Sequence, residues 1–228
     1  FDNYTKLNDT SNYGNDGSNH GATWTPNGRY GGAYEFDGGD DRVGLGNDIS
    51  VQMGTSDFSI CLWLKTSSGG EILNKRNDNS IPYPGYRVHI YNGHGKIDLF
   101  DGSRDYPENV KGVNGVKELT DNLWHHVCFV ADRDSQAKIF VDAVQDASEP
   151  ISTHDGTLDS SVGLTMGSRA SEDAGFFEGK MDNLIMFKRM LTENEIKQLY
   201  MSSLRKYDAD KWQLYVNESN LTNGTYTY

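Results

Sequence analysis

One aspartate stands in the middle of an otherwise apolar segment near the end of the sequence. Residues Met181–Phe187 alternate like a β-strand, and this alternation places Asp182 on the same face as Leu184 and Met186. A carboxylate on an apolar strand face costs free energy unless a cation or several hydrogen-bond donors compensate its charge. We therefore expect Asp182 either to accept hydrogen bonds from backbone amides or to bind a metal ion.

A second source of oxygen ligands is the loop DTSNYGNDG, which spans Asp9–Gly17. Its glycines allow a tight turn, because glycine adopts positive φ without a steric penalty. Its aspartate and asparagine side chains provide oxygens that either bond the turning backbone or coordinate a hard cation. The residues that supply these oxygens are Asp9, Asn12, Asn15 and Asp16.

Flat rings and hydrogen-bonding side chains gather between residues 83 and 106. Sugar-binding surfaces combine aromatic rings, which stack on the sugar, with a few polar groups that bond its hydroxyls. An arginine adds bidentate hydrogen bonds to such a surface. We predict that this segment binds glycans through Tyr83, Tyr86, His89, Tyr91, Asn92, Arg104 and Tyr106.

Motifs for catalysis are missing from the sequence, which has no H-E-x-x-H, G-x-S-x-G, P-loop or C-x-x-C. Glycoside hydrolases need two carboxylates that flank one glycosidic bond. The nearest pair, Asp98 and Asp101, has an odd spacing and so points to opposite faces of an ideal strand. We predict a non-catalytic protein and keep a glycoside hydrolase as a minor alternative.

Adjacent histidines, His125 and His126, lie in a second alternating segment. Neighbours on a strand point to opposite faces, so the two rings cannot chelate one ion together. We interpret one as a surface residue and the other as an interior histidine.

The two cysteines of the chain, Cys61 and Cys128, each lie in the middle of a segment that alternates like a strand. On neighbouring strands in an oxidising compartment they would form a disulfide, and otherwise they would be two buried thiols. We predict the disulfide.

Length and composition favour one all-β domain. The chain has 228 residues, 25 glycines and only 5 prolines, which suits short strands joined by tight turns. Its net charge of −12 argues against nucleic acid as a partner and permits cations as ligands. No apolar run approaches the roughly 18 residues that span a bilayer, so we expect a soluble chain without direct membrane insertion. It starts without a signal peptide, as a mature protein or an excised fragment would.

Five Asn-x-Ser/Thr sequences suggest glycosylation and therefore an extracellular or cell-surface protein. They begin at Asn3, Asn8, Asn217, Asn220 and Asn223.

A short helix is predicted to begin at Thr192. Thr192 and Glu195 form a capping box, and Leu191 and Ile196 occupy the positions of a hydrophobic staple.

Several segments resemble the laminin G-like jelly rolls of the concanavalin A-like superfamily. The C-terminal segment carries Gly179 and Asp182, followed by R-x-L-T-x-x-E-I at Arg189–Ile196. The residues FDGGDDRV at Phe36–Val43 resemble the family's F-D-G-x-D-D-x-V signature, and WHHV resembles its W-H-H-V-A strand. The loop Asp9–Gly17 is similar to the family's D-x-S-G-N-x-N-D-G, with asparagine and tyrosine at positions 12 and 13 where glycine and asparagine are usual.

The resemblance implies a two-sheet antiparallel jelly-roll sandwich of about a dozen strands with one short C-terminal helix. It covers residues 1–203. Residues 204–228 lie outside it and form either a C-terminal extension, which adds a strand to an edge of the sandwich, or the start of a following module.

The resemblance also implies a structural Ca²⁺, because relatives hold calcium between an aspartate of the last strand and N-terminal oxygens. Calcium accepts six to eight oxygen ligands without strict geometry. The expected ligands are Asp2, Asn12, Asn15, Gly38 and Asp182. The competing expectation leaves Asp182 bonded to backbone amides of the Asn12–Asn15 loop, with no ion.

The function that the resemblance implies is a non-catalytic extracellular glycan-binding, lectin-like or adhesion module stabilised by calcium. Its partner would be a glycan or a cell-surface glycoprotein, and the module would form part of a larger multidomain protein. The alternative is a protein-recognition or structural spacer domain of a larger surface protein, because one fold serves several functions.

Overall fold

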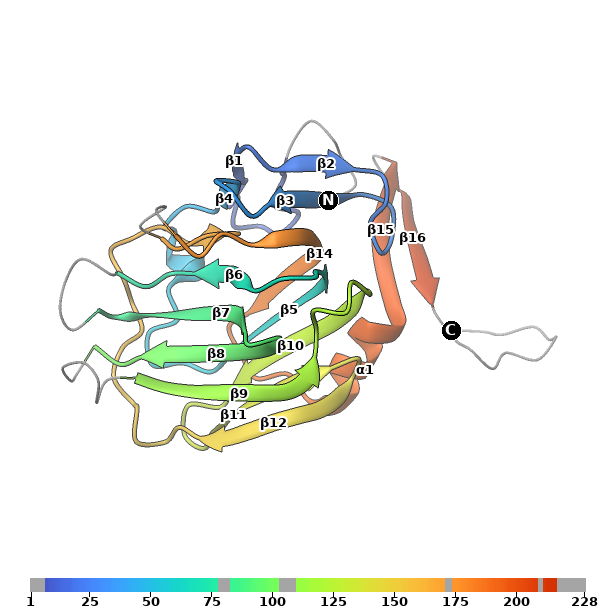
Figure 1. Ribbon diagram of the computed structural model, residues 1–228. Coiled ribbons are helices and arrows are strands. Elements are labelled where there is room, and N and C mark those ends of the chain that lie inside the picture. The colour runs from blue at the N-terminus through green and yellow to red at the C-terminus, as the bar shows by residue number, and fades with distance from the viewer. Residues whose placement is uncertain (1–6, 78–82, 103–109, 171–173, 209–210, 217–228) are drawn as a thin grey trace.

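Two antiparallel sheets of seven strands each lie face to face as layers (Figure 1). The computed structural model describes residues 7–77, 83–102, 110–170, 174–208 and 211–216. The predicted two-sheet jelly-roll sandwich is therefore confirmed, with fourteen strands in its two sheets rather than about a dozen.

The first sheet contains the strand β7 (Gly85–Tyr91), which carries Tyr86, His89 and Tyr91 of the residues predicted to bind glycans. Consecutive strands β6 to β9 pair in chain order at one side of it, and short strands complete the other side. In spatial order its strands are β1 (Ser18–His20), β4 (Arg42–Gly44), β13 (Thr165–Met166), β6 (Gly70–Asn74), β7 (Gly85–Tyr91), β8 (His94–Phe100) and β9 (Val110–Glu118).

The second sheet brings together strands that are far apart in the sequence. Its central strand β5 pairs with β10 on one side and with β14 on the other. In spatial order its strands are β12 (Val144–Pro150), β11 (Gln136–Val141), β10 (His125–Ala131), β5 (Phe58–Lys65), β14 (Glu178–Phe187), β3 (Ala33–Asp37) and β2 (Thr23–Thr25).

The strand β5 shows how the sequence separates the two faces of this sheet. Phe58, Ile60, Leu62 and Leu64 alternate along it and lie in the core between the sheets. The intervening Cys61 lies in a second apolar cluster on the outer face. Both faces of β5 are buried, as the bulky residues on both faces of the segment predict.

The second sheet is covered on its outer face by the helix α1 (Glu193–Met201), which buries Ile196 against the outer apolar cluster. The predicted capping box is confirmed. The backbone N–H of Thr192 donates to Glu195 Oε2 at 2.9 Å, and the N–H of Glu195 donates to Thr192 Oγ1 at 3.3 Å. A single 3₁₀ turn, η1 (Ile49–Val51), is the other helical element of the described residues. Within the same residues, no helix combines the length and apolar character needed to cross a membrane.

The expected side-chain pattern of β14 is wrong, because the strand contains a β-bulge. The pairing of β14 with β5 shifts between Asp182 and Ile185, and Asn183 between them has a left-handed φ of 48°. Beyond the bulge the alternation changes phase. Leu184 and Met186 pack against the core between the sheets, whereas Asp182 pairs with Trp63 of β5. Asp182 therefore does not share a face with these two apolar residues.

The segment after α1 forms a separate hairpin. Its strands β15 (Ser202–Asp208) and β16 (Lys211–Val216) pair with each other in a two-stranded sheet, which lies at one end of the sandwich in Figure 1. In the described part of the chain, neither strand extends an edge of the two large sheets. The proposed boundary near residue 203 stays a prediction.

Candidate functional site

Charged and aromatic side chains cover the outer face of the first sheet along β7 and β8. Tyr86, Val88 and Ile90 of β7 lie in the core, so the alternate residues of this strand point outward. The strand pairing then sets His89 beside Lys96 and Arg87 beside Asp98. We call the following group the outer-face cluster: Glu71, Arg87, His89, Tyr91, Lys96, Asp98 and Arg169.

The carboxylate of Asp98 is the centre of the cluster. It is 2% exposed, and its Oδ2 accepts a hydrogen bond from Arg87 Nε at 2.9 Å and lies 3.1 Å from His89 Nε2. The ammonium of Lys96 lies 3.3 Å from Oδ1. Burial favours the protonated form, but the hydrogen bond with His89 and the positive charges of Arg87, His89 and Lys96 outweigh it and lower the pKa of Asp98 to about 2. Asp98 thus stays ionised and holds three side chains in place.

A second buried carboxylate, Glu71, extends the cluster across β6. Its Oε1 lies 3.2 Å from Arg87 Nη1 and 3.9 Å from Arg169 Nε. Arg87 therefore bridges the two carboxylates, Glu71 and Asp98. A guanidinium held by two fixed anions has little conformational freedom left to lose when a ligand binds.

Tyr91 provides an exposed ring at the end of β7. It is 52% exposed, and the ammonium of Lys96 lies 5.0 Å from its ring centroid. The His89 ring lies 6.1 Å from it. The next residue, Asn92, is also exposed and begins the turn to β8 with a left-handed φ of 50°. An aromatic ring beside hydrogen-bonding groups is an arrangement that can stack on a sugar and bond its hydroxyls.

The row of cations and rings continues from the cluster toward the other end of β8. Phe100 is 1% exposed and lies under two guanidiniums, with Arg76 at 4.2 Å and Arg87 at 5.6 Å from its ring centroid. Arg76 also lies 5.3 Å from the ring of Tyr83. Tyr83 therefore borders the same face.

The residues predicted to bind glycans are only partly brought together. His89, Tyr91 and Asn92 lie side by side, and Tyr83 borders their face. Tyr86 was assigned wrongly, because its ring is 0% exposed in the core and its hydroxyl donates to the Val51 carbonyl at 2.9 Å. Arg104 and Tyr106 lie outside the described residues.

Five charged members of the cluster were not among the residues predicted to bind glycans: Glu71, Arg87, Lys96, Asp98 and Arg169. Arg87 lies two residues before His89 on the same face of β7, and Lys96 lies opposite His89 on β8. The alternation of YRVHIY would have placed Arg87 on the outward face with His89. Glu71 and Arg169 come from distant parts of the sequence, so no local pattern marks them.

Asp182 is held by backbone amides. It is 1% exposed, and its Oδ2 accepts hydrogen bonds from the N–H groups of Arg29 at 2.9 Å and Tyr30 at 3.1 Å. These donors come from a different loop than expected. Its Oδ1 is buried and has no hydrogen-bond partner among the described residues. Burial raises the pKa of Asp182 against the opposing effect of these backbone donors.

The five expected calcium ligands do not form one site. Gly38 lies at one end of β14, where its N–H donates to the Phe177 carbonyl at 3.1 Å. Asp182 is five residues further along this strand, on the order of 15 Å at the usual rise. Calcium–oxygen distances of about 2.3 to 2.6 Å exclude one ion between Gly38 and Asp182. Asp2 lies outside the described residues.

The Asp9–Gly17 loop uses the carboxylate of Asp9 to bond its own backbone. The carboxylate of Asp9 accepts hydrogen bonds from the N–H groups of Ser11 at 2.8 Å and Asn15 at 2.9 Å. The side-chain amide of Asn15 donates to Ser50 Oγ at 2.9 Å, and Asn12 is exposed. Of the two roles expected for these oxygens, bonding the turning backbone is the one observed for Asp9.

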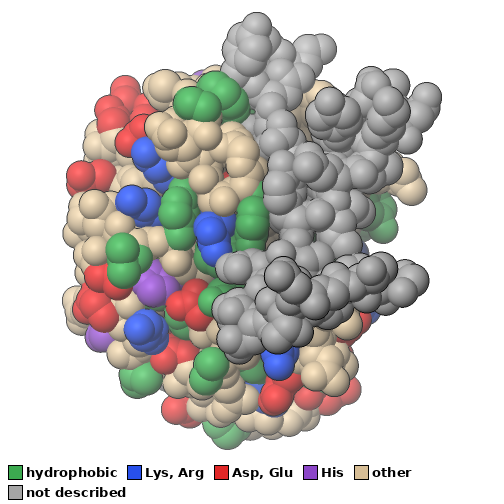
Figure 2. Space-filling model, turned by 90° about the vertical axis from the view of Figure 1, so that its right-hand side faces the viewer, with side chains coloured by type: hydrophobic (Ala, Val, Ile, Leu, Met, Phe, Trp, Pro, Cys, Tyr) green, Lys and Arg blue, Asp and Glu red, His purple; other side chains and the backbone are tan. Residues whose placement is uncertain are grey.

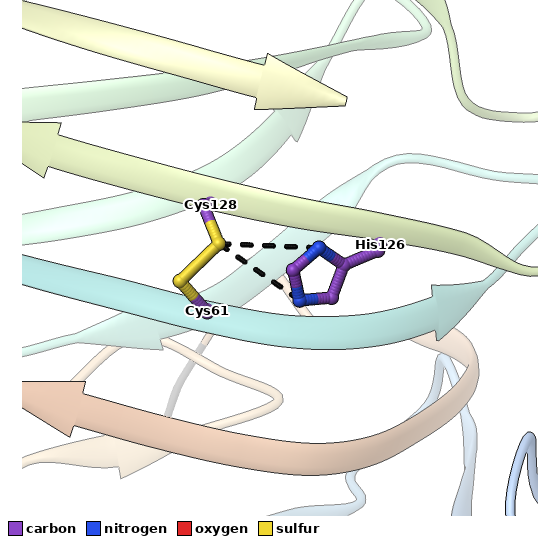
Figure 3. Close-up of side chains that lie close together, drawn as sticks. All are labelled: Cys61, His126 and Cys128. Atoms are coloured by element: carbon purple, nitrogen blue, oxygen red, sulfur yellow. Dashed lines mark hydrogen bonds between the residues drawn. A yellow bond between two sulfur atoms is a disulfide. The ribbon is translucent and has the colours of Figure 1, made fainter. Parts of the chain in front are cut away.

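The predicted disulfide is present (Figure 3). Cys61 and Cys128 lie directly opposite each other on β5 and β10, and the two sulfurs are 2.11 Å apart. His126 lies beside it, with its ring nitrogens 3.9 and 4.0 Å from Cys128 Sγ. Burial lowers the pKa of His126 to about 4. An oxidised cysteine pair offers no thiolate, so this group is a structural bridge and not a zinc site.

Both histidines of the pair are buried, so the interpretation of one as a surface residue is wrong. His125 is 5% exposed and lies between two carboxylates, 2.8 Å from Asp142 and 3.2 Å from Asp121. His126 is 3% exposed and contacts the ring of Trp63, at 5.3 Å between centroids.

A depression of about 500 Å³ lies on the second sheet, near the ends of β3, β5 and β14. Charged and polar side chains line it, including Glu35, Lys65, Asn122 and Lys180. The one aromatic residue of its lining, Phe36, is 1% exposed and packs in the core. Among the described residues this depression therefore offers no exposed ring for stacking, unlike the outer-face cluster.

Residues 37–197 match a family model described as the concanavalin A-like lectin/glucanases superfamily. This span includes the whole outer-face cluster. No curated protein matches the chain.

Solved structures with the same fold include binding domains of a mosquitocidal protein and of botulinum neurotoxins. One is the binding domain of Paraclostridial Mosquitocidal Protein 1, with a TM-score of 0.69 and 14% identity over 85% of this chain and 49% of that chain. Another is the botulinum neurotoxin serotype D ligand binding domain in complex with N-acetylneuraminic acid, with a TM-score of 0.65 and 18% identity over 85% and 47%. A third is botulinum neurotoxin type C, which depends on interaction with two ganglioside molecules to enter cells (TM-score 0.65, 16% identity, 87% and 49%). The chain thus spans about half the length of these structures.

Proposed function

Because the chain belongs to the concanavalin A-like lectin/glucanase superfamily, we propose that it is a non-catalytic glycan-binding module that binds through the outer-face cluster. The observation that carries this proposal is the half-exposed ring of Tyr91 beside Lys96 and His89, two side chains that the buried Asp98 fixes. Stacking on Tyr91 would hold one sugar ring, and the fixed donors would select its hydroxyls.

A binding role suits these carboxylates better than hydrolysis. A glycoside hydrolase needs one carboxylic acid that holds a proton near neutral pH. Asp98 has a lowered pKa and is surrounded by cations, so it carries no proton to donate. Glu71 is engaged by Arg87 and lies near Arg169. Both acids therefore serve to position cations.

The solved structures with this fold are consistent with the proposal, since one holds N-acetylneuraminic acid and another acts through gangliosides. Those ligands belong to chains about twice as long, of which this chain matches half. The proposal for this chain therefore rests on its own outer-face cluster. We further propose that the module is part of a larger extracellular or cell-surface protein, glycosylated at its asparagine sequences, and that it recognises glycans on a partner surface.

The alternative function is recognition of a protein partner. Widely exposed aliphatic side chains include Val116 at 73% on β9, Leu123 at 60% before β10, and Val144 at 69% on β12. Where such side chains form a contiguous patch, they mark a protein-interaction site.

A glycan array decides between these two functions. We expect the wild-type protein to bind a subset of glycans and Tyr91→Ala to lose that binding at an unchanged melting temperature. The matched control is Tyr13→Ala, since Tyr13 is 64% exposed outside the cluster. Glycan binding that survives in Tyr91→Ala would move the site elsewhere. Binding to proteins alone, lost in Val144→Ser, would favour the alternative.

We also propose that one calcium ion stabilises the fold at Asp182. The supporting observation is the buried Oδ1 of Asp182, which has no hydrogen-bond partner among the described residues. A buried carboxylate oxygen without a donor is costly, and a bound cation would compensate its charge. Of the five expected ligands, this proposal keeps Asp182. Gly38 lies beside Phe177, too far from Asp182 along β14 to bind the same ion.

A further inference from the structure

The outer-face cluster presents its cations to solvent and hides its acids. The side chains of Arg169, Lys96 and Arg87 are 45%, 21% and 18% exposed, respectively. Those of Glu71 and Asp98 are only 5% and 3% exposed. The two carboxylates therefore form the floor of the cluster, and the charges that a ligand meets are positive.

The charge balance of the cluster is also positive. Three permanent cations, Arg87, Lys96 and Arg169, face two carboxylates, which leaves an excess of one positive charge before any contribution from His89. The whole chain, in contrast, has a formal net charge of −12. Figure 2 shows acidic and basic side chains interspersed over the described surface of one end of the molecule. The cationic surface of the cluster is thus a local property.

Hydrogen-bond donors remain in the cluster after its internal ion pairs are satisfied. Lysine has three N–H donors and arginine five. Among the described residues, Lys96 has one close carboxylate, Asp98, at 3.3 Å, and Arg169 approaches Glu71 only to 3.9 Å. A ligand anion can take the remaining donors without breaking these pairs.

We infer that the outer-face cluster takes an anionic sugar, one that carries a carboxylate or a sulfate group. This inference rests on the proposed glycan-binding function and names the class of glycan. The ammonium of Lys96 lies 5.0 Å from the centroid of the Tyr91 ring, so an anion on Lys96 lies next to a sugar stacked on Tyr91. A sugar that carries its charge on or beside the ring fits this spacing.

The observations favour a sugar over a nucleic acid. Nucleic acids need a broad basic surface that follows many phosphates. Among the described residues, the outer-face cluster is a local excess of cations on an acidic chain, beside the exposed ring of Tyr91. One or two anionic groups are what such a cluster can neutralise.

Titration with three matched sugars tests the inference: 3′-sialyllactose, sulfated lactose and neutral lactose. We expect the wild-type protein to bind one or both acidic sugars at least tenfold more tightly than lactose, with an affinity that falls as salt rises. The two acidic sugars carry a carboxylate and a sulfate, respectively, so comparing their affinities shows which anionic group the protein prefers.

Variants connect the preference to the cluster. We expect Lys96→Gln and Arg169→Gln each to lower the affinity for the acidic sugar about tenfold, because each loses a charge-assisted hydrogen bond. The matched control is Lys180→Gln on the second sheet, near Glu35, which should leave the affinity unchanged. Melting curves check that each variant is folded.

The outcomes separate the two proposals. Lactose bound as tightly as the acidic sugars, with loss in Tyr91→Ala, overturns the anionic class and leaves the glycan-binding function standing. An acidic preference that persists in both Lys96→Gln and Arg169→Gln also overturns the inference. A folded protein that binds no glycan on the array or in titration overturns both.

Discussion

Asp98 and Gly112 face each other across the pairing of β8 with β9, and the carboxylate of Asp98 occupies the space where a side chain on Gly112 would stand. A Cβ on Gly112 would lie 2.2 Å from Asp98 Oδ1. The position of the outer-face cluster therefore depends on a glycine in the neighbouring strand that makes no ion pair itself.

Replacing Gly112 by alanine is expected to displace the Asp98 carboxylate and loosen Arg87, His89 and Lys96. We expect glycan affinity to fall about tenfold or more and the free energy of unfolding to fall by about 1–3 kcal/mol, since the strand must accommodate an overpacked methyl group. Calorimetric titration and urea unfolding measure the two effects.

The control for this substitution is Gly44→Ala on β4, where the nearest heavy atom to a Cβ, on Ser18, is 3.9 Å away. This variant should keep both glycan affinity and stability. Full glycan affinity in a folded Gly112→Ala protein would show that Asp98 does not position the cluster.

Asp98 is also expected to make the fold sensitive to acid. Its pKa is about 2 in the folded protein and 3.8 in the reference state, so its ion pairs stabilise the fold above pH 4. This contribution is lost as the pH falls from about 4 to about 2. The pKa difference corresponds to about 2 kcal/mol.

Denaturant unfolding from pH 7 to pH 2 measures this contribution in wild type and in Asp98→Asn. We expect the variant to be less stable at pH 7 and the difference to shrink toward pH 2. The exposed Glu193→Gln serves as the control. A stability difference that is constant over this range would contradict the assigned ion pairs.

Features that depend on strand alternation were predictable from the sequence. The two faces of β5 and the capped helix after Leu191 follow from local spacing and turn chemistry. The alternation also places Cys61 and Cys128 in the middle of strands, although their pairing depends on the register of β5 with β10. Tyr86 was misassigned because the prediction took both faces of YRVHIY as one surface, although alternation separates Tyr86 from Arg87.

Features that depend on one backbone conformation or on distant contacts were not predictable. The bulge at Asn183 reverses the faces of β14, and no residue type in the segment requires it. Glu71 and Arg169 reach the cluster from separate strands and loops. The same holds for the amides of Arg29 and Tyr30, which reach Asp182 from about 150 positions away in the sequence.

The disulfide between Cys61 and Cys128 is expected to stabilise the fold by limiting the unfolded chain. The cysteines are 67 residues apart, and a closed loop of that length corresponds to about 4 kcal/mol in the chain-entropy treatment. Urea unfolding of the double variant Cys61→Ala/Cys128→Ala measures this loss. Equal stability of the double variant and the oxidised wild type would contradict it.

Calcium binding at Asp182 can be tested with Asp182→Asn, because the substitution should change the melting temperature in opposite directions without and with calcium. Because burial raises the pKa of Asp182 in the folded state, its ionised form opposes folding, and stability without metal falls as the pH rises through its titration. Without calcium, Asp182→Asn is therefore expected to melt at the same or a higher temperature than wild type at pH 7.

Calcium should reverse this order. An ion that binds only the folded state stabilises it by RT ln(1 + [L]/Kd), about 2.7 kcal/mol at a hundredfold excess over Kd. Wild type should gain melting temperature in calcium and lose it in excess chelator, whereas Asp182→Asn should not respond. Asp9→Asn is the control, because the carboxylate of Asp9 already bonds the backbone of its own loop. If wild type melts at the same temperature in calcium and in chelator, the proposed ion is contradicted. The amides of Arg29 and Tyr30 are then the partners of Asp182.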